Sequence, residues 1–224
     1  METFRALIPR WVVSLVAAFL VVQVALSLGF IGYIKGVPGT RQFNMDSELN
    51  LPAWWSSSLL IAAGLVCVGM WLTGSRMNRP SIQWLGIASG FFLLSAEEIA
   101  AIHEDVGVAV GGGTENVSVW PLVYAPIAAV FIWMMLRAVR ELPRPIAFIA
   151  VGGLMSYVGV LVLEVLSLTA ESNVTILIEE NLEMLGTALM FAALASELTH
   201  RFLALYPEPR QAAEAAREMA VEAT

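Results

Sequence analysis

The amino-acid sequence predicts an all-α fold: a polytopic membrane helix bundle with six transmembrane helices and both termini in the cytoplasm. Hydrophobic residues make up 58% of the 224 residues and charged residues only 14%, whereas soluble domains average about 25% charged residues. Apolar runs near or above the ~20 residues that cross a bilayer recur six times along the chain. The basic residues fall almost entirely in alternate connections between these runs.

The six apolar runs give the expected helices in chain order. They cover residues 11–34, 53–73, 81 to about 106, 119–139, 145–168 and 174 to about 205. The first run is too long for a signal peptide and lacks an A-x-A-like cleavage site, so we expect a retained helix. Tryptophans mark the ends of the first four runs as an interfacial aromatic belt does: Trp54, Trp55 and Trp120 at outer ends, Trp11, Trp71 and Trp84 at inner ends. In the third and fifth runs, Gly86-x-x-x-Gly90 and Gly152-x-x-x-Ser156 permit close helix packing.

The distribution of basic residues orients the bundle. Ten of the twelve lie at the N-terminus, in alternate loops or at the C-terminus, and only Lys35 and Arg41 lie on the other side. By the positive-inside rule both termini are cytoplasmic, and we expect the inner membrane of a bacterium. The lipid bilayer is therefore the main partner, and no basic patch supports nucleic-acid binding. One transmembrane domain over residues 1–206 and a short polar tail over 207–224 account for the chain.

Acidic clusters stand out inside two of the apolar runs. A carboxylate at membrane depth costs roughly 2.5 to 3.5 kcal/mol on insertion, so such groups usually mark an ion, proton or substrate site. At ~1.5 Å per residue, Glu97 and Glu98 lie ~24 to 26 Å above the start of the third helix, and the acids of the sixth lie ~7 to 14 Å below the outer surface. Eight ionisable groups are thus expected in one layer of the outer half: Glu97, Glu98, His103, Glu104, Glu164, Glu179, Glu180 and Glu183.

Angular spacing gives each acidic helix a carboxylate face. At ~100° per residue, Glu97 and Glu104 are ~20° apart, while Glu180 and Glu183 lie within ~60° of each other. His103 joins the layer's centre only if the third helix bends near its outer end. Glu and His side chains directed toward a bundle axis are how carboxylate-bridged metal proteins are built. The expected ligands of a divalent metal ion are Glu98, His103, Glu104, Glu164, Glu179, Glu180 and Glu183.

Three functions fit this layer. The first is a metal-dependent membrane hydrolase, in which Glu97 or Glu183 is the general base toward a lipid or lipid-linked substrate; zinc, manganese, iron, magnesium and calcium are not distinguished. The second is a divalent-cation or proton-coupled transporter that uses the same carboxylates. The third is a non-catalytic membrane assembly protein whose acids form a structural polar network. A transporter needs a polar path to the cytoplasm, and the sequence below Glu183 offers few polar residues, which favours a site open to one side.

The motifs S-x-E-E-x4-H-E and E-E-x2-E-x2-G resemble those of a group of uncharacterised bacterial multi-pass membrane proteins. The resemblance covers two of the six helices and implies no particular activity. It implies that one functional set comprises Glu97, Glu98, His103, Glu104, Glu179, Glu180, Glu183 and Gly186.

Overall fold

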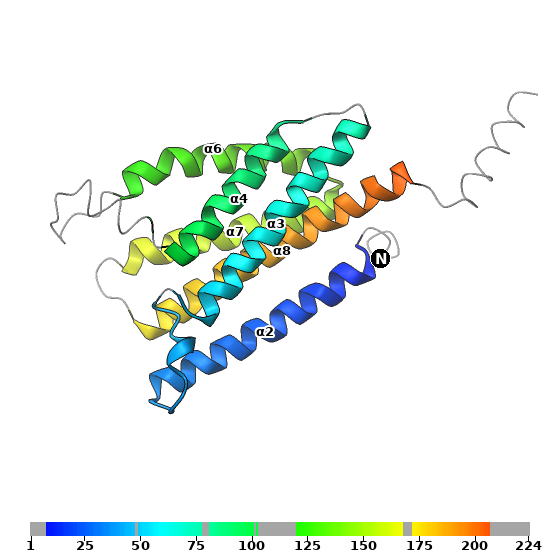
Figure 1. Ribbon diagram of the computed structural model, residues 1–224. Helices are drawn as coiled ribbons and strands as arrows, with labels where there is room; N and C mark the ends of the chain where they lie inside the picture. Colours follow the sequence, from blue (N-terminus) through cyan, green and yellow to red (C-terminus); the bar gives the residue numbers. More distant parts are fainter. Residues whose placement is uncertain are drawn as a thin grey trace, which may run out of the picture.

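A computed structural model describes residues 8–47, 49–77, 81–100, 102, 120–167 and 172–206, with the backbone alone for 120–125 and 164–167. Within these residues the chain is a bundle of six α-helices with no strand (Figure 1). A short 3-10 turn, η1 (Arg41–Phe43), lies between the first two helices. The six helices are α2 (Arg10–Ile34), α3 (Leu51–Arg76), α4 (Gln83–Ala100), α6 (Trp120–Glu141), α7 (Arg144–Ser167) and α8 (Asn173–Leu205).

Local signals explain where two of the helices begin. Before α3, the Asn50 side chain accepts a hydrogen bond from the Ala53 amide at 2.9 Å, and Pro52 occupies the first turn. Before α8, the Ser172 hydroxyl accepts one from the Thr175 amide at 3.2 Å. Both side chains accept hydrogen bonds from backbone amides of the first turn, which have no partner within the helix. Proline is tolerated in the first turn because it has no backbone amide hydrogen that would need a partner.

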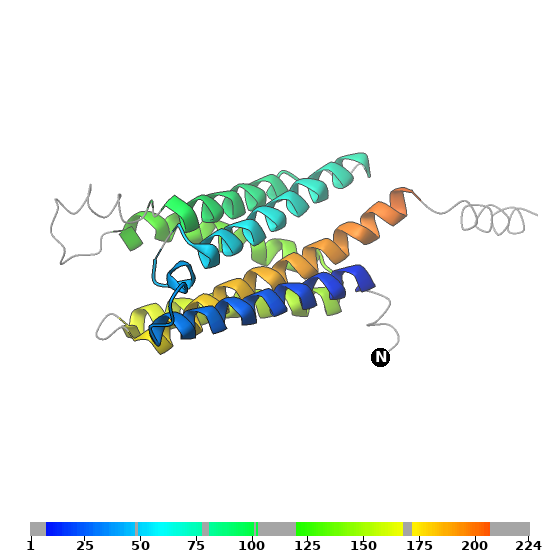
Figure 2. The ribbon, with the colours of Figure 1, turned by 60° about the horizontal axis from the view of Figure 1, so that its bottom comes forward.

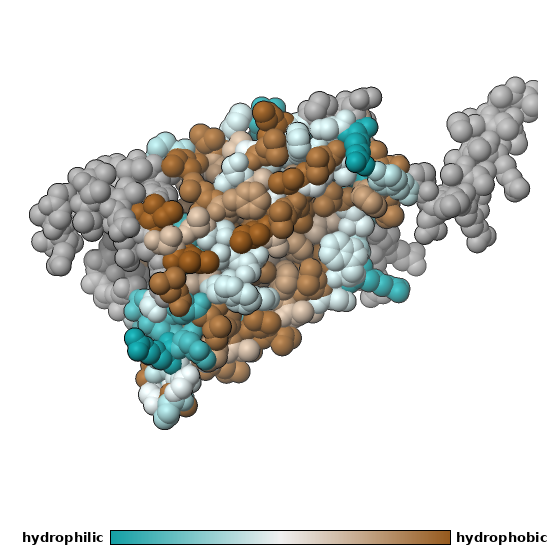
Figure 3. All heavy atoms as spheres, in the orientation of Figure 1, coloured by the Kyte–Doolittle hydropathy of each residue, from teal (hydrophilic) through white to brown (hydrophobic). Residues whose placement is uncertain are grey.

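Four helices are long and apolar enough to cross a membrane: α2, α3, α7 over residues 144–163, and α8. The face drawn in Figure 3 has a mainly hydrophobic middle, with the most hydrophilic residues gathered toward the two ends of the bundle. The prediction of a membrane helix bundle is confirmed at this level. The six predicted runs correspond to the six observed helices, but α4 and α6 do not reach that apolar length over their described residues. The described α4 has 18 residues, so its one possible span includes the acids Glu97 and Glu98, which lower the mean hydropathy.

Helix α8 is the centre of the bundle. It packs against α2, α3 and α7, while α3 also packs against α4, and α4 against α6. Figures 1 and 2 show α8 running the length of the molecule between these neighbours. The main core lies where α3, α4 and α8 meet and is built from fully buried side chains such as Met70, Trp84, Ile87, Phe91 and Leu194.

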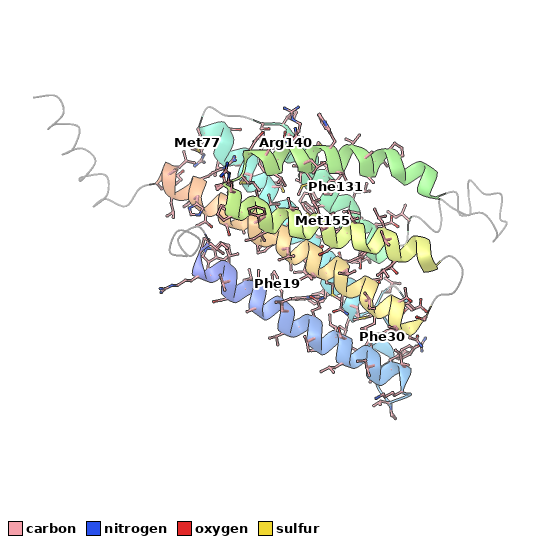
Figure 4. The ribbon with its side chains drawn as sticks, turned by 180° about the vertical axis from the view of Figure 1, so that it is seen from behind. Phe19, Phe30, Met77, Phe131, Arg140 and Met155 are labelled. Carbon is pink, nitrogen blue, oxygen red and sulfur yellow. The ribbon has the colours of Figure 1, made fainter. Side chains whose placement is uncertain are left out.

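The arginines of the helix ends gather at one end of the bundle. Because successive helices alternate in direction, the start of α2 and the end of α8 lie together (Figures 1 and 2). Figure 4 places Met77, just after α3, and Arg140 of α6 at this same end, whereas Phe30 of α2 lies toward the other. We call it the basic end, and its arginines are Arg10, Arg76, Arg140, Arg144 and Arg201. The last turn of α4 and the first turns of α8 belong to the opposite end, here called the acidic end.

Helices α7 and α8 cross in backbone contact at two glycines. A Cβ atom on Gly153 would lie 2.8 Å from the Gly186 carbonyl oxygen, and one on Gly186 would lie 3.0 Å from that of Gly153. A Cβ atom on Gly152 would meet no atom nearer than Leu189 at 3.6 Å. The close contact expected at Gly152 is therefore made one residue later, because the rotation of α7 turns Gly153 toward α8. In α4, Gly86 and Gly90 do pack closely, against Met134 and Phe131 of α6.

Two predicted features lie outside the described residues: the tail at 207–224, and the extension of the third helix from 103 to about 106.

Candidate metal centre

Three carboxylates from two helices converge at the acidic end. Glu98 of α4 and Glu180 and Glu183 of α8 each offer one oxygen atom, and these atoms lie within 4.8 Å of one another. All three residues are half-buried, and each takes part in polar or electrostatic interactions with its surroundings. The spacing of three residues puts Glu180 and Glu183 on one strip of α8, so both can face a single point opposite Glu98. We call these three residues the carboxylate cluster.

A buried serine pair fixes α4 beside α3 one turn before Glu98. The Ser57 hydroxyl of α3 donates to the Ser95 carbonyl oxygen at 3.0 Å and lies 2.7 Å from the Ser95 hydroxyl oxygen. Both serines are buried. Small hydroxyl residues let helices approach closely and bond across the contact. This contact gives the serine of the S-x-E-E motif a structural role: it sets the rotation of α4 and therefore the direction in which Glu98 leaves it.

Helix α2 holds α8 from the other side through Asn181. The Gln23 amide of α2 donates to the Asn181 carbonyl oxygen and to its side-chain oxygen, both at 2.8 Å. Ser27 donates to the same side-chain oxygen at 3.1 Å. Asn181 lies between Glu180 and Glu183 in the sequence but leaves the helix on a different face. Its anchoring to α2 therefore fixes the rotation that turns the two glutamates away from α2.

Tyr157 of α7 supplies a hydroxyl beneath the cluster. Its oxygen lies 2.5 Å from the Thr187 hydroxyl oxygen of α8, and its ring packs against Gly186, where a Cβ atom would lie 2.9 Å from two ring carbons. Tyr157 is also close enough to Glu183 and Glu98 to feel their charges. Tyr157 was not predictable as a site residue, because it lies in an otherwise apolar run. The one signal in the sequence is that the small residues Gly186 and Thr187 of α8 leave room for a partner.

Apolar packing closes the bundle beyond this hydroxyl pair. Thr187 itself is fully buried, and so are Met190 and Leu194 farther along α8. The side chains that face them from α3 and α4 are apolar as well. The carboxylate cluster therefore lies above a closed core and not at the head of a polar channel through the described residues.

The remaining predicted site residues fall outside the cluster or outside the described side chains. Glu97 and Glu179 are half-buried and interact with other groups, but neither belongs to the cluster. Each precedes a cluster residue by one position, which directs its side chain ~100° away around the helix. Glu164 is on α7, where only the backbone is described, and His103 and Glu104 lie outside the described residues.

The three carboxylates of the cluster repel one another when all of them are charged. At an effective dielectric constant of about 20, two unit charges less than 5 Å apart repel by roughly 3 kcal/mol or more, and three charged carboxylates contain three such pairs. A divalent cation held by one oxygen from each would replace this repulsion with attraction. Protons shared among the carboxylates would also relieve it. Replacing a glutamate by glutamine distinguishes a bound cation from shared protons. The amide resembles a protonated carboxyl group in shape but lacks the charge that a cation needs.

Comparison with known proteins yields a family without an assigned activity. The model of a family described as Domain of unknown function (DUF8692) matches residues 11–197, a range that includes the carboxylate cluster and extends from the start of α2 into α8, whose last turns lie beyond it. No curated protein and no solved structure matches the chain.

Proposed function

The chain belongs to the DUF8692 family, and we propose that it is an integral membrane protein that binds a divalent cation at the carboxylate cluster. The observation that carries the proposal is the convergence of three carboxylate oxygens from α4 and α8 within 4.8 Å. Four of the helices are long and apolar enough to cross a membrane, where ionisable side chains are costly and usually functional. The surrounding contacts, Ser57 with Ser95 and Gln23 with Asn181, hold both helices in the rotation that the cluster requires.

The ligand atoms indicate the class of cation. Three carboxylate oxygens suit the oxygen-preferring ions magnesium, calcium and manganese. His103 follows Glu98 by five residues, and a nitrogen ligand from it would extend the range to zinc and iron. We propose Glu98, Glu180 and Glu183 as the core ligands, with Glu179, Glu104, Glu164 and His103 as the further donors expected from the sequence.

The reaction that we propose is metal-assisted hydrolysis of a lipid or lipid-linked substrate. A bound cation lowers the pKa of a coordinated water, and a nearby carboxylate that is not a ligand removes its proton. The sequence offered Glu97 and Glu183 for that role. Because Glu183 is one of the three converging ligands, Glu97 is the better general base: it is half-buried, adjacent to Glu98 and outside the cluster.

A site open to one side supports hydrolysis over transport. A transporter must connect its ion site to both surfaces, and beyond Thr187 toward the basic end the core is mainly apolar, as at Met190 and Leu194. The buried Ser196 in this region donates its hydroxyl hydrogen bond to the Ala192 carbonyl oxygen of its own helix. We therefore propose that substrate reaches the cluster from the acidic end.

The membrane placement that we propose has six spans in a bacterial inner membrane, with the basic end in the cytoplasm and the acidic end in the periplasm. The concentration of arginines at one end of the helices supports it. In a Cys67→Ala background, we expect Asn173→Cys, at the start of α8, to react with a membrane-impermeant thiol reagent applied to intact spheroplasts. Ile82→Cys, between α3 and α4 and 81% exposed, should react only after the membrane is opened. The reverse pattern would place the cluster on the cytoplasmic side and contradict the proposed orientation.

Metal-dependent stability tests the cation proposal. A ligand that binds only the folded state stabilises it by about 2.7 kcal/mol at 100 times its dissociation constant, which corresponds to several degrees for a protein of this size. We expect the thermal midpoint of the purified protein to fall in chelator and to rise on addition of at least one of manganese, magnesium, calcium, zinc or iron. A midpoint that is the same in chelator and in all five cations would contradict the proposal.

A further inference from the structure

A second concave surface lies at the basic end, far from the carboxylate cluster. It is a groove of about 480 Å³ between α2, α3 and α8, a volume in the range of small-molecule sites. In Figure 2 the first turns of α2 and the last turns of α8 diverge at this end. On α8 the groove begins at Ala195, twelve residues and thus ~18 Å after Glu183. Thirteen residues line it, among them Trp11, Gly69, Arg76, Ala195, Leu198 and Tyr206.

The walls of the groove offer hydrocarbon almost exclusively. Two threonines lie among the apolar lining residues, but both hydroxyls bond to their own helices. Thr73 donates to the Gly69 carbonyl oxygen at 2.9 Å, and Thr199 donates to that of Ala195 at 2.8 Å. The surface presented to an occupant is therefore suited to an alkyl chain and not to a polar molecule.

The mouth of the groove is cationic and aromatic. Arg76 is in the last turn of α3 and Tyr206 directly follows α8, and the Arg76 guanidinium donates a hydrogen bond to the Tyr206 hydroxyl. A guanidinium carries five N–H donors in a geometry that fits phosphate, so this bond leaves others available. No acidic residue is among the thirteen lining residues, all of which are described. Trp11, at the start of α2, also lines the mouth. Aromatic side chains of this kind are typical of proteins at the headgroup level of membranes.

We propose that this groove binds an anionic phospholipid of the surrounding leaflet, with an acyl chain between α2, α3 and α8 and the phosphate at Arg76. The charge complementarity of the mouth and the apolar walls together define such a ligand. The base of the groove is closed by contact between α3 and α8, where a Cβ atom on Gly69 would lie 2.8 Å from the Leu198 side chain. An acyl chain lies within a groove of this volume, whereas a helix about 10 to 12 Å across would only lie over it. The inference is independent of the metal site.

Lipid binding to the purified full-length protein tests this proposal. Phosphatidylglycerol and phosphatidylcholine with identical acyl chains are added to detergent-solubilised protein, and the bound fraction is measured by native mass spectrometry. One basic residue near the membrane surface favours an anionic lipid by about fivefold. We therefore expect the unaltered protein to bind at least that much more phosphatidylglycerol than phosphatidylcholine. In Arg76→Gln the ratio should fall to near one. In Arg140→Gln, a charge-matched control at the same end outside the groove, it should stay unchanged.

A second variant tests the chain-binding part of the groove. Gly69→Leu fills its base and should lower retention of both lipids, and thermal unfolding of the same sample verifies that the variant is folded. If Gly69→Leu does not fold, the Arg76 and Arg140 pair still decides the question. Equal binding of the two lipids, an equal loss in both arginine variants, or a dimer that forms through this face would overturn the proposal.

Discussion

We expect Glu183→Gln to abolish the metal-dependent rise in thermal midpoint and to leave the helical content unchanged. The amide keeps the shape of the side chain but loses the charge that binds the cation. Loss of a group that merely supports a ligand typically costs 10- to 100-fold in affinity, so loss of a ligand itself should cost at least about 100-fold. Titration of the chelator-treated protein with the stabilising cation, read by thermal unfolding, measures the change.

Two matched variants complete this prediction. Glu197→Gln, on the same helix but paired with Arg201 at the basic end, should bind the cation as the unaltered protein does. Glu97→Gln should also retain the cation but lose about 10²- to 10⁴-fold in turnover, measured as hydrolysis of phospholipid vesicles. Full cation binding by Glu98→Gln and Glu183→Gln together would instead identify the cluster as a protonated structural network.

We expect Gly153→Ala to lower the stability of the protein, whereas Gly152→Ala, one residue earlier, should not. In an exposed helix, replacing glycine by alanine is favourable by up to about 1 kcal/mol. At Gly153 the added methyl would lie 2.8 Å from the Gly186 carbonyl oxygen, and a backbone atom cannot move aside as a side chain does. Overpacking of this kind costs about 1 to 3 kcal/mol, or several degrees in thermal midpoint.

Position 152 is the internal control, because its methyl would make only ordinary contact with Leu189 at 3.6 Å. Separation of α7 from α8 also withdraws Tyr157 from Thr187, so Gly153→Ala should weaken cation binding as well. Equal thermal midpoints for the two variants would contradict the close crossing of these helices.

The helices themselves were predictable from hydrophobicity. Each of the six apolar runs contains a helix of the structure, and most observed boundaries fall within three residues of the predicted ones. The physical reason is that a span must be continuously apolar over its whole length. Polar connections such as the one after Ile34, where Gly36 adopts a φ of 71°, therefore mark the ends clearly.

The approach of acids from the third and sixth helices was predictable, but the choice of the residues that meet was not. Depth and helical periodicity brought the acids of the third and sixth helices together, and Glu98, Glu180 and Glu183 do meet. Whether Glu97 or Glu98 faces the partner depends on a rotation of α4 of ~100°, which the Ser57 and Ser95 contact sets. That contact joins residues far apart in the sequence. Tyr157 escaped prediction for the same reason, since only the crossing of α7 and α8 brings it beneath the cluster.

Elemental analysis of the protein, purified without chelator, tests the central claim most directly. A mononuclear site held by Glu98, Glu180 and Glu183 predicts about one equivalent of a divalent metal per chain, or two if the additional donors complete a binuclear site. Glu183→Gln, purified in parallel, should contain little or none. Metal-free protein that acquires no manganese, magnesium, calcium, zinc or iron when these are added would contradict the account and leave protons as the charges that neutralise the cluster.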